Sequence, residues 1–510
     1  MGRASIRGGS MKTTFNQNNF STIAFCSQSR KTTTLKAKHE NTKKVPMVRA
    51  RRRTCNNVMI TIISLIVVCV AIHTMHRYKL TDYRLLLIPQ RKCNSNLRVL
   101  IIAPENDKTI NHIFENLGYA LVHNINDNWD ILWSTTADPF NLYTSHMTKL
   151  KPHQVVNHFP PHLSHYMSYM NWGDGLKHKQ KYILHSFKLP EMKKELMDYE
   201  KDSHKRFVIR DCLVNGMKVI NANDNINYNA SLVLQEFLDN PLLINKMILE
   251  FGVYVLMSSV NPLRIYRYNG DVDIKFFQLT DSKHFCLNPQ MVSESFNKNS
   301  INSYLNTNGY NVTLLYENID NAIVSFLMMN EQYIVKHTKN IEQLHHFIHL
   351  MRFNIIMDTK LNVYVRDIQA GEDFKGIEDY ERIIYSTLKT VGALNYYEFE
   401  CRNNVSCKML SQSKDIVTNP QSCLDYPCNV SSSCSSSKCE MCLQCLNQVP
   451  DVLNHLHRSY REHMQCGHMK RIFPAYNNYH DGNIVNQLSS VNRLSLKWFQ
   501  AKCETDSAWC

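Results

Sequence analysis

Short apolar runs alternate with amphipathic stretches from residue 96 to about residue 400, which is typical of a domain that mixes helices and strands. Runs of four to eight apolar, β-branched or aromatic residues predict buried strands. These runs are Leu97–Ala103, Trp129–Ser134, Phe207–Arg210, Lys218–Asn221, Val233–Phe237, Val253–Met257, Leu263–Tyr268, Asn354–Met357 and Asn362–Arg366. The third and fourth runs flank Val214–Gly216 and predict a hairpin. We therefore predict an α+β fold for this part of the chain.

Two stretches have helical spacing of their apolar residues, Ala322–Asn330 and Ile341–Met351, and the Asn-rich stretch Asn297–Asn311 predicts a loop. On the second helix, His345 and His349 would have the i, i+4 spacing of a metal-binding pair. No Glu lies between them, as it would in the zinc motif H-E-x-x-H. We therefore favour solvated or locally hydrogen-bonded histidines over a metal site.

The apolar run Val58–Met75 contains no Asp, Glu, Lys or Arg. As a helix rising about 1.5 Å per residue it would span roughly 27 Å, which is sufficient for the core of a bilayer. It begins too far along the chain for a cleavable signal peptide. The run predicts a single-pass signal anchor, and the alternative is a buried core helix.

Most of the positive charge lies in a basic arm before this run. Residues 1–57 contain thirteen Lys and Arg residues and one Glu, which accounts for +12 of the net charge of +14. The rest of the chain is nearly neutral, so the composition does not indicate nucleic-acid binding. Arg49 and Arg51–Arg53 precede the run, whereas the cations after it are sparser. The positive-inside rule predicts a cytosolic N-terminus and a lumenal or extracellular C-terminal domain.

Eleven of the seventeen cysteines lie in residues 401–510, in a segment rich in Ser and Asn. This density favours a disulfide-bonded module in an oxidising compartment. The alternative is a zinc site, because Cys439, Cys442 and Cys445 have chelating spacing and His468 lies nearby in the sequence. Four glycosylation sequons agree with a lumenal glycoprotein. They begin at Asn229, Asn311, Asn404 and Asn429.

These observations predict five consecutive parts of the chain. They are a disordered basic cytosolic arm (1–57), a transmembrane signal anchor (58–75), a stalk (76–95), an α+β domain (96–400) and a Cys-rich tail (401–510). The membrane is therefore a predicted partner of the first three parts.

A series of short motifs runs through the α+β domain. They are Trp129–Ser134 (WDILWS), Gln154–Pro160 (QVVNHFP), Phe187–Pro190 (FKLP), Pro241–Ile244 (PLLI), Tyr254–Tyr266 (YVLMSSVNPLRIY) and Arg352–Tyr364 (RFNIIMDTKLNVY). In this order and spacing they resemble the tubulin–tyrosine-ligase-like family, especially its polyglutamylase-type members. The resemblance covers roughly residues 97–370 and leaves out the predicted anchor and the Cys-rich tail.

The resemblance implies an ATP-grasp fold and the ATP-dependent ligation of glutamate to side-chain carboxylates of a protein, with tubulin as the family substrate. Such chemistry requires a cation at the phosphates, Mg²⁺ held by acidic side chains, and a basic group for the carboxylate of the incoming amino acid. ATP and Mg²⁺ are therefore the cofactors expected of an active member, and none is expected otherwise.

The resemblance also assigns residues to these roles. Arg210 stands where the family has a phosphate-binding Lys, and Gln235 keeps the family pattern near the adenine. Glu250 keeps an acid at the catalytic motif before Tyr254. The Lys and Arg of that motif, which in the family contact phosphate and the incoming carboxylate, are replaced here by Ile248 and Gly252.

The family's metal ligands, an Asp followed by Glu-x-Asn, correspond to Asn354, Asp367 and Gln369. One formal negative charge is lost, Asp367 is shorter than Glu, and Gln369 is longer than Asn. Because Mg²⁺ requires near-octahedral oxygens at about 2.1 Å, these changes predict weaker metal binding. Asp358 is a nearby acid that could supply the missing charge.

Two functions agree with these residues. The first is a membrane-anchored ligase of the polyglutamylase type, and the second is a catalytically impaired pseudo-ligase that binds or scaffolds a partner in the secretory pathway. If residues 76–510 are lumenal, cytosolic tubulin is out of reach, and the acceptor of a ligase would be another protein.

Overall fold

The computed structural model describes residues 97–510 with interruptions, all of them within one compact unit, Pro89–Cys510. The interruptions are residues 104–107, 136–138, 152, 160–180, 201–204, 213–215, 222–225, 230–231, 272, 280–284, 291–296, 339–343, 371–379, 395–415, many positions in 419–449, 477–484 and 486–487. The predicted arm, anchor and stalk lie outside the described residues. Within the described residues, no helix combines the length and apolar character that crossing a bilayer requires.

The first described elements form a small parallel sheet in the strand order β2-β1-β3-β4. The strands are β1 (Arg98–Ile102), β2 (Ala120–Val122), β3 (Ile131–Ser134) and β4 (Val155–Val156), with helix α2 (Thr109–Asn116) between the first two. The strands predicted at Leu97–Ala103 and Trp129–Ser134 are confirmed. Asn157 of the QVVNHFP motif has a structural role here, because its carboxamide accepts from Ser134 N at 2.8 Å and donates to Ser134 O at 2.9 Å.

The remaining strands form a large, mainly antiparallel sheet in the order β15-β14-β10-β12-β13-β7-β6-β8-β5, with β9 and β11 paired to β10, and β16 paired to β11. They are β5 (Ser186–Leu189), β6 (Arg206–Cys212), β7 (Gly216–Asn221), β8 (Leu232–Glu236), β9 (Leu243–Ile244), β10 (Met247–Val260), β11 (Leu263–Tyr268), β12 (Asp273–Leu279), β13 (Phe285–Gln290), β14 (His349–Met357), β15 (Val363–Ala370) and β16 (Met469–Phe473). The predicted hairpin is confirmed as β6 and β7. Strand β10 is buried along almost its whole length because its alternate side chains enter two different apolar clusters, one on each face of the sheet.

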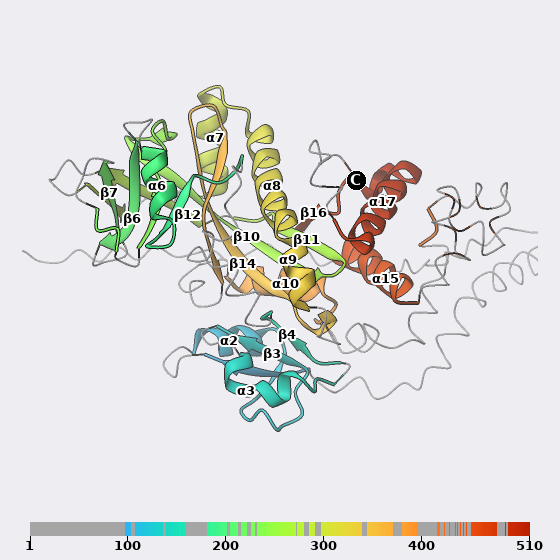
Figure 1. Cartoon of the computed structure of the whole chain (residues 1–510). Helices are drawn as coiled ribbons and strands as arrows, with labels where there is room; N and C mark the ends of the chain where they lie inside the picture. Colours follow the sequence, from blue (N-terminus) through green and yellow to red (C-terminus); the bar gives the residue numbers. More distant parts are fainter. Residues whose placement is uncertain are drawn as a thin grey trace, which may run out of the picture. The chain divides into compact units, whose positions relative to one another are not determined.

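The other helices lie beside both sheets and in the C-terminal segment (Figure 1). They are α3 (Pro139–Met147), α6 (Lys193–Glu200), α7 (Lys298–Thr307), α8 (Val312–Met329), α9 (Glu331–Thr338), α10 (Tyr380–Thr390), α15 (Pro450–Gln465) and α17 (Ser490–Thr505), with 3₁₀ turns η2 (Leu344–His346) and η6 (Ser507–Trp509). The long helix α8 packs on β15 and β16 (Figure 1). The mixture of helices and strands confirms the predicted α+β class.

The loop predicted at Asn297–Asn311 is wrong, because this stretch contains helix α7. Two of its asparagines, Asn297 and Asn311, lie at helix starts. The Asn297 side chain accepts from Ser300 N at 2.9 Å, and Asn311 caps α8 by accepting from Leu314 N at 3.1 Å. Asparagine favours both loops and N-caps, since its side chain satisfies free backbone donors. The buried Ile301 and Leu305 carry the helical period.

The helix predicted at Ile341–Met351 is also wrong, because strand β14 begins at His349. Every residue of β14 is buried, so the run lacks the alternation that distinguishes a half-exposed strand from a helix. His346 Nδ1 donates to Gln154 O at 2.5 Å, and the ring of His349 stacks on Phe159 with centroids 5.1 Å apart. His345 and His349 therefore do not form a helical pair.

The C-terminal segment contains four disulfides among its described cysteines: Cys423–Cys442, Cys428–Cys439, Cys434–Cys445 and Cys503–Cys510. Their Cα atoms lie 5.3–5.7 Å apart, within the normal range for a disulfide. The closely spaced Cys439, Cys442 and Cys445 each bond to a different partner, which confirms the disulfide interpretation over zinc. No cluster of three metal-ligating side chains occurs among the residues that the structure describes.

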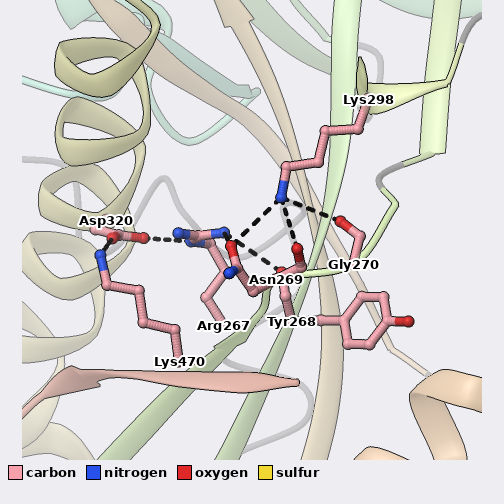
Figure 2. A network of polar contacts seen from close by, with 7 residues as sticks. All are labelled: Arg267, Tyr268, Asn269, Gly270, Lys298, Asp320 and Lys470. Carbon is pink, nitrogen blue, oxygen red and sulfur yellow. Dashed lines mark hydrogen bonds and ion pairs between the residues drawn. The ribbon is translucent and has the colours of Figure 1, made fainter. Parts of the chain in front are cut away.

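Strand β16 connects the C-terminal segment to the large sheet by pairing antiparallel with β11. Figure 2 shows an ion-pair network at this junction. Asp320 on α8 lies between two cations, with Oδ1 2.5 Å from Arg267 Nε and Oδ2 3.0 Å from Lys470 Nζ. The network thus joins α8, β11 and β16.

Candidate active site

Strands β10, β14 and β15 are neighbours in the large sheet and bring most of the predicted site residues together. Gly252 on β10 lies opposite Asn354 on β14, which lies opposite Asp367 on β15. Glu250 lies two residues before Gly252, and Gln369 lies two residues after Asp367, so each shares a sheet face with its neighbour. The cluster of Glu250, Asn354, Asp367 and Gln369 is hereafter the acidic face.

A β-bulge in β15 adds a cation to the acidic face. The pairing shifts between Asn354 opposite Asp367 and Ile355 opposite Val365, which leaves Arg366 as the extra residue. A bulge turns a side chain that would otherwise point to the opposite face. Arg366 Nε donates to Glu250 Oε2, and Arg366 Nη1 lies 3.1 Å from Asp367 Oδ2. One guanidinium therefore bridges both carboxylates.

Asn354 forms the second internal contact of the acidic face. Its Nδ2 donates to Asp367 Oδ1 at 2.5 Å, and both side chains are buried. An Asp at position 354 would place two carboxylates in contact, and like charges at this distance repel strongly. The amide converts that repulsion into a hydrogen bond, which allows Asp367 to be buried beside it.

Gly252 lies directly beneath an arginine of the neighbouring strand. A Cβ atom at position 252 would lie 3.0 Å from Arg352 Cδ and 2.9 Å from Asp273 Cβ, so any larger residue would displace these side chains. Arg352 Nη1 donates to Asp273 Oδ2 at 2.8 Å, and Arg352 Nη2 donates to Gln369 Oε1. The family has an arginine at the position of Gly252, and here the Arg352 side chain of β14 occupies the space beside that position.

Lys275 on β12 adds a further cation, opposite Glu250 on β10. Its Nζ lies 3.9 Å from Asp273 Oδ2. Partial burial and the positive charge of Arg352 lower the pKa of Lys275, although Asp273 and Glu250 oppose the shift. Sequence reasoning did not identify Lys275, Asp273, Arg352 or Arg366. The signal for Arg366 was a charged residue within an otherwise apolar predicted strand.

The two predicted nucleotide residues lie on the strands β6 and β8. Gln235 on β8 donates through Nε2 to Ser186 Oγ at 3.3 Å and to Arg366 O at 3.4 Å, so it contacts the bulge. Arg210 lies on β6, and its side chain is outside the described part of the structure. Gln235 therefore joins the acidic face, and the position of Arg210 relative to it stays a prediction.

The residues of the acidic face do not fit a divalent metal as they stand. Both oxygens of Asp367 accept from Asn354 and Arg366, and the Gln369 oxygen accepts from Arg352. Within the acidic face, the buried oxygens left without a hydrogen bond are Glu250 Oε1 and Asn354 Oδ1. One carboxylate oxygen and one amide oxygen are far from the near-octahedral set that Mg²⁺ requires.

A cavity of about 790 Å³ lies elsewhere, beside the junction of β11 and β16. Its lining includes Asn269, Asp320, Lys470 and Trp509 and contains no residue of the acidic face. This cavity is therefore separate from the residues to which the resemblance assigns the chemistry.

Residues 145–276 match the model of the tubulin-tyrosine ligase family. This match includes Gln235, Glu250, Gly252 and Lys275 and ends before β14. The probable tubulin polyglutamylase ttll-15 of Caenorhabditis elegans is 25% identical over 445 residues, which cover 79% of this chain and 83% of the relative. The similarity thus extends well beyond the matched segment.

Other relatives match over a smaller share of their own length. Tubulin polyglutamylase TTLL6 of Mus musculus is 22% identical over 49% of this chain and 34% of the relative. Tubulin monoglutamylase TTLL4 of Homo sapiens is 21% identical over 74% of this chain and 35% of the relative. The chain spans about a third of these two proteins. The comparisons confirm the resemblance to glutamate ligases of the tubulin–tyrosine-ligase type.

Proposed function

We propose that this chain is a tubulin–tyrosine-ligase-like ligase that uses ATP to join glutamate to side-chain carboxylates of a protein. The relatives whose names describe tubulin polyglutamylases and monoglutamylases support the reaction type. The observation that carries the proposal is the position of Arg352, which lies over Gly252 where the family's carboxylate-binding arginine is missing.

The surroundings of Arg352 suit a carboxylate ligand. The contacts of its guanidinium include an acid, Asp273, and a neutral acceptor, Gln369. A carboxylate that replaced the Gln369 amide would exchange a neutral hydrogen bond for a charge-assisted one, which is about twice as strong. Arg352 is therefore our candidate for binding the incoming glutamate, with Lys275 as the second cation of the site.

The acceptor and the compartment belong to the same proposal. Tubulin or another protein is the acceptor, and a membrane anchor at residues 58–75 holds the ligase with its C-terminal part lumenal or extracellular. Asn229 and Asn311 lie in sequons within the described part of the chain. A glycosidase-sensitive mobility shift of the full-length protein is expected. An unglycosylated protein whose C-terminal part is digested by protease added to sealed microsomes would instead support a cytosolic orientation and tubulin as acceptor.

The reaction is tested by ATP-dependent incorporation of labelled glutamate into tubulin and into secretory proteins. We expect Arg352→Gln to lose incorporation at least tenfold, since it removes the charge at the proposed carboxylate site. The matched control is Arg206→Gln, because Arg206 pairs with Asp239 at the exposed start of β6. Equal incorporation by Arg352→Gln and the wild type would contradict the proposal.

The bridge formed by Arg366 favours a second function, ligand binding without turnover. A guanidinium that contacts both Glu250 and Asp367 neutralises the carboxylates on which metal-assisted phosphoryl chemistry depends. In this case calorimetry detects binding of ATP or glutamate, but the protein incorporates no labelled glutamate into any acceptor. Incorporation that Asp367→Ala abolishes would exclude this second function.

A further inference from the structure

We propose that Arg366 takes the place of a divalent cation in the acidic face, so that this site binds its anionic ligand without a metal. The identity of that ligand as a nucleoside triphosphate rests on the proposed function. The replacement of the metal itself rests on the contacts of Arg366 alone.

The charges of the site are already balanced. Its acids are Glu250, Asp273 and Asp367, and its cations are Lys275, Arg352 and Arg366, so each negative charge has a positive partner within the described site. A bound dication would add two positive charges to a buried, neutral cluster. Burying charge that lacks a counter-charge is strongly unfavourable. The balance therefore opposes binding of a metal ion by itself, without an anionic ligand, independently of the coordination geometry.

Arg366 is also held in position from several sides. Its Nε and Nη1 contact Glu250 and Asp367, and its Cζ lies 5.7 Å from the centroid of the Phe277 ring. Its backbone carbonyl accepts from Gln235 Nε2 at 3.4 Å, and only 13% of its side chain is exposed. Because the bulge places its backbone as well, the guanidinium is a fixed part of the site.

A metal ion both neutralises negative charge and coordinates several oxygens at once, and a guanidinium can perform the first of these tasks. It neutralises carboxylates and offers directional donors to phosphate oxygens, and it does not depend on the concentration of free ions. It cannot coordinate several oxygens octahedrally as Mg²⁺ does. The site should therefore retain phosphate affinity in the absence of divalent ions, at a cost in catalytic power.

The direct test uses Mn²⁺ alone as the probe, with free Mn²⁺ measured by electron paramagnetic resonance on the full-length protein. We expect the wild type and Asp367→Asn to bind Mn²⁺ equally, which shows that Asp367 holds none. Arg366→Leu, which frees both carboxylates, should gain a site with at least tenfold higher affinity. A wild-type Mn²⁺ site that Asp367→Asn removes, or a folded Arg366→Leu variant that gains none, would overturn the inference.

A second measurement separates this inference from the proposed function and does not require Arg366→Leu to fold. ATP binding to the wild type is measured by calorimetry with Mg²⁺ and with EDTA. Equal affinity in both supports the inference, whereas ATP binding only with Mg²⁺ overturns it and leaves the ligase proposal intact. Absence of both ATP binding and glutamate incorporation refutes the ligase proposal, and the Mn²⁺ result then decides the inference by itself.

Discussion

Glu462 on α15 is the residue whose loss should most weaken the attachment of the C-terminal segment to the large sheet. Its Oε2 accepts from Arg264 Nε at 2.8 Å, from Ser258 Oγ at 2.7 Å and from Tyr266 OH at 3.1 Å, while Oε1 accepts from Arg264 Nη2 at 3.0 Å. The Arg264 side chain is only 3% exposed. The carboxylate thus satisfies a buried cation and two buried hydroxyls at once.

The change Glu462→Ala leaves Arg264 buried without its counter-charge. Removing one partner of a buried ion pair costs about 3–5 kcal/mol of unfolding free energy, mostly because the other charge stays desolvated. Glu462→Gln keeps the shape and one acceptor oxygen but loses the charge. Because charge-assisted hydrogen bonds are about twice as strong as neutral ones, we expect roughly half of the alanine effect.

The assay is urea denaturation followed by tryptophan fluorescence, since Trp498 and Trp509 lie in the apolar cluster next to α15. The matched control is Glu504→Ala, an exposed acid on α17 for which we expect a change within about 0.5 kcal/mol. A Glu462→Ala variant that loses less than about 1 kcal/mol would refute the argument, because the buried charge would then have found another partner or solvent.

Three further predictions follow from the geometry. Burial lowers the pKa of His158 to about 4 and that of His349 to about 3, below the ordinary 6.5, so the unfolded chain binds these protons more readily. The contribution of these histidines to the unfolding free energy should be complete above pH 6.5. It should fall by up to roughly 1.4 kcal/mol per pH unit for each group as the pH drops towards the two folded-state values. His349→Phe should reduce this acid sensitivity when denaturation is measured as a function of pH. Gly252→Arg should lose glutamate incorporation because its side chain collides with Arg352, and Arg352→Gly should lose it because the charge is removed. The double variant, which exchanges the two residues, should recover incorporation. A double variant no more active than the single variants would show that the two positions do not share one function. Asp320→Ala should lower the unfolding free energy by about 3 kcal/mol, since Arg267 is buried beside it, and an unchanged denaturation midpoint would contradict this.

The sequence could predict the strands of the domain because buried strands have a local signature. The apolar runs at β1, β3, β8 and β11 identified their strands within two residues, and the run Val253–Met257 identified only the middle of β10. The loop predicted at Asn297–Asn311 and the helix predicted at Ile341–Met351 were wrong for different physical reasons. Asparagine suits a helix cap as well as a loop, and a strand buried on both faces has no alternation to reveal it.

The site could be predicted only as a set of positions on separate strands. The resemblance placed Glu250, Asn354 and Asp367 in the site, and the register of three strands brings them together. Arg352 and Arg366 could not be found in this way. The role of Arg352 depends on which residue of β10 lies beneath its side chain. The role of Arg366 depends on a bulge that changes the face of the sheet to which its side chain points. Arg352 meets β10 through pairing of strands about 100 residues apart, which no local pattern encodes. The bulge at Arg366 lies within the β14–β15 pair, and the charged residue in that predicted strand does not reveal to which face it turns.

The pairing of β11 with β16 has a consequence for how the chain is made. The two strands are separated by about 200 residues, so β11 leaves the ribosome long before its partner exists. At about 5–20 residues per second, this delay is roughly 10–40 s. During that time the backbone edge of β11 has no strand to pair with, and unpaired edges promote aggregation. Chains that end before residue 469 should therefore depend on chaperones to remain soluble, however complete the rest of the sheet is.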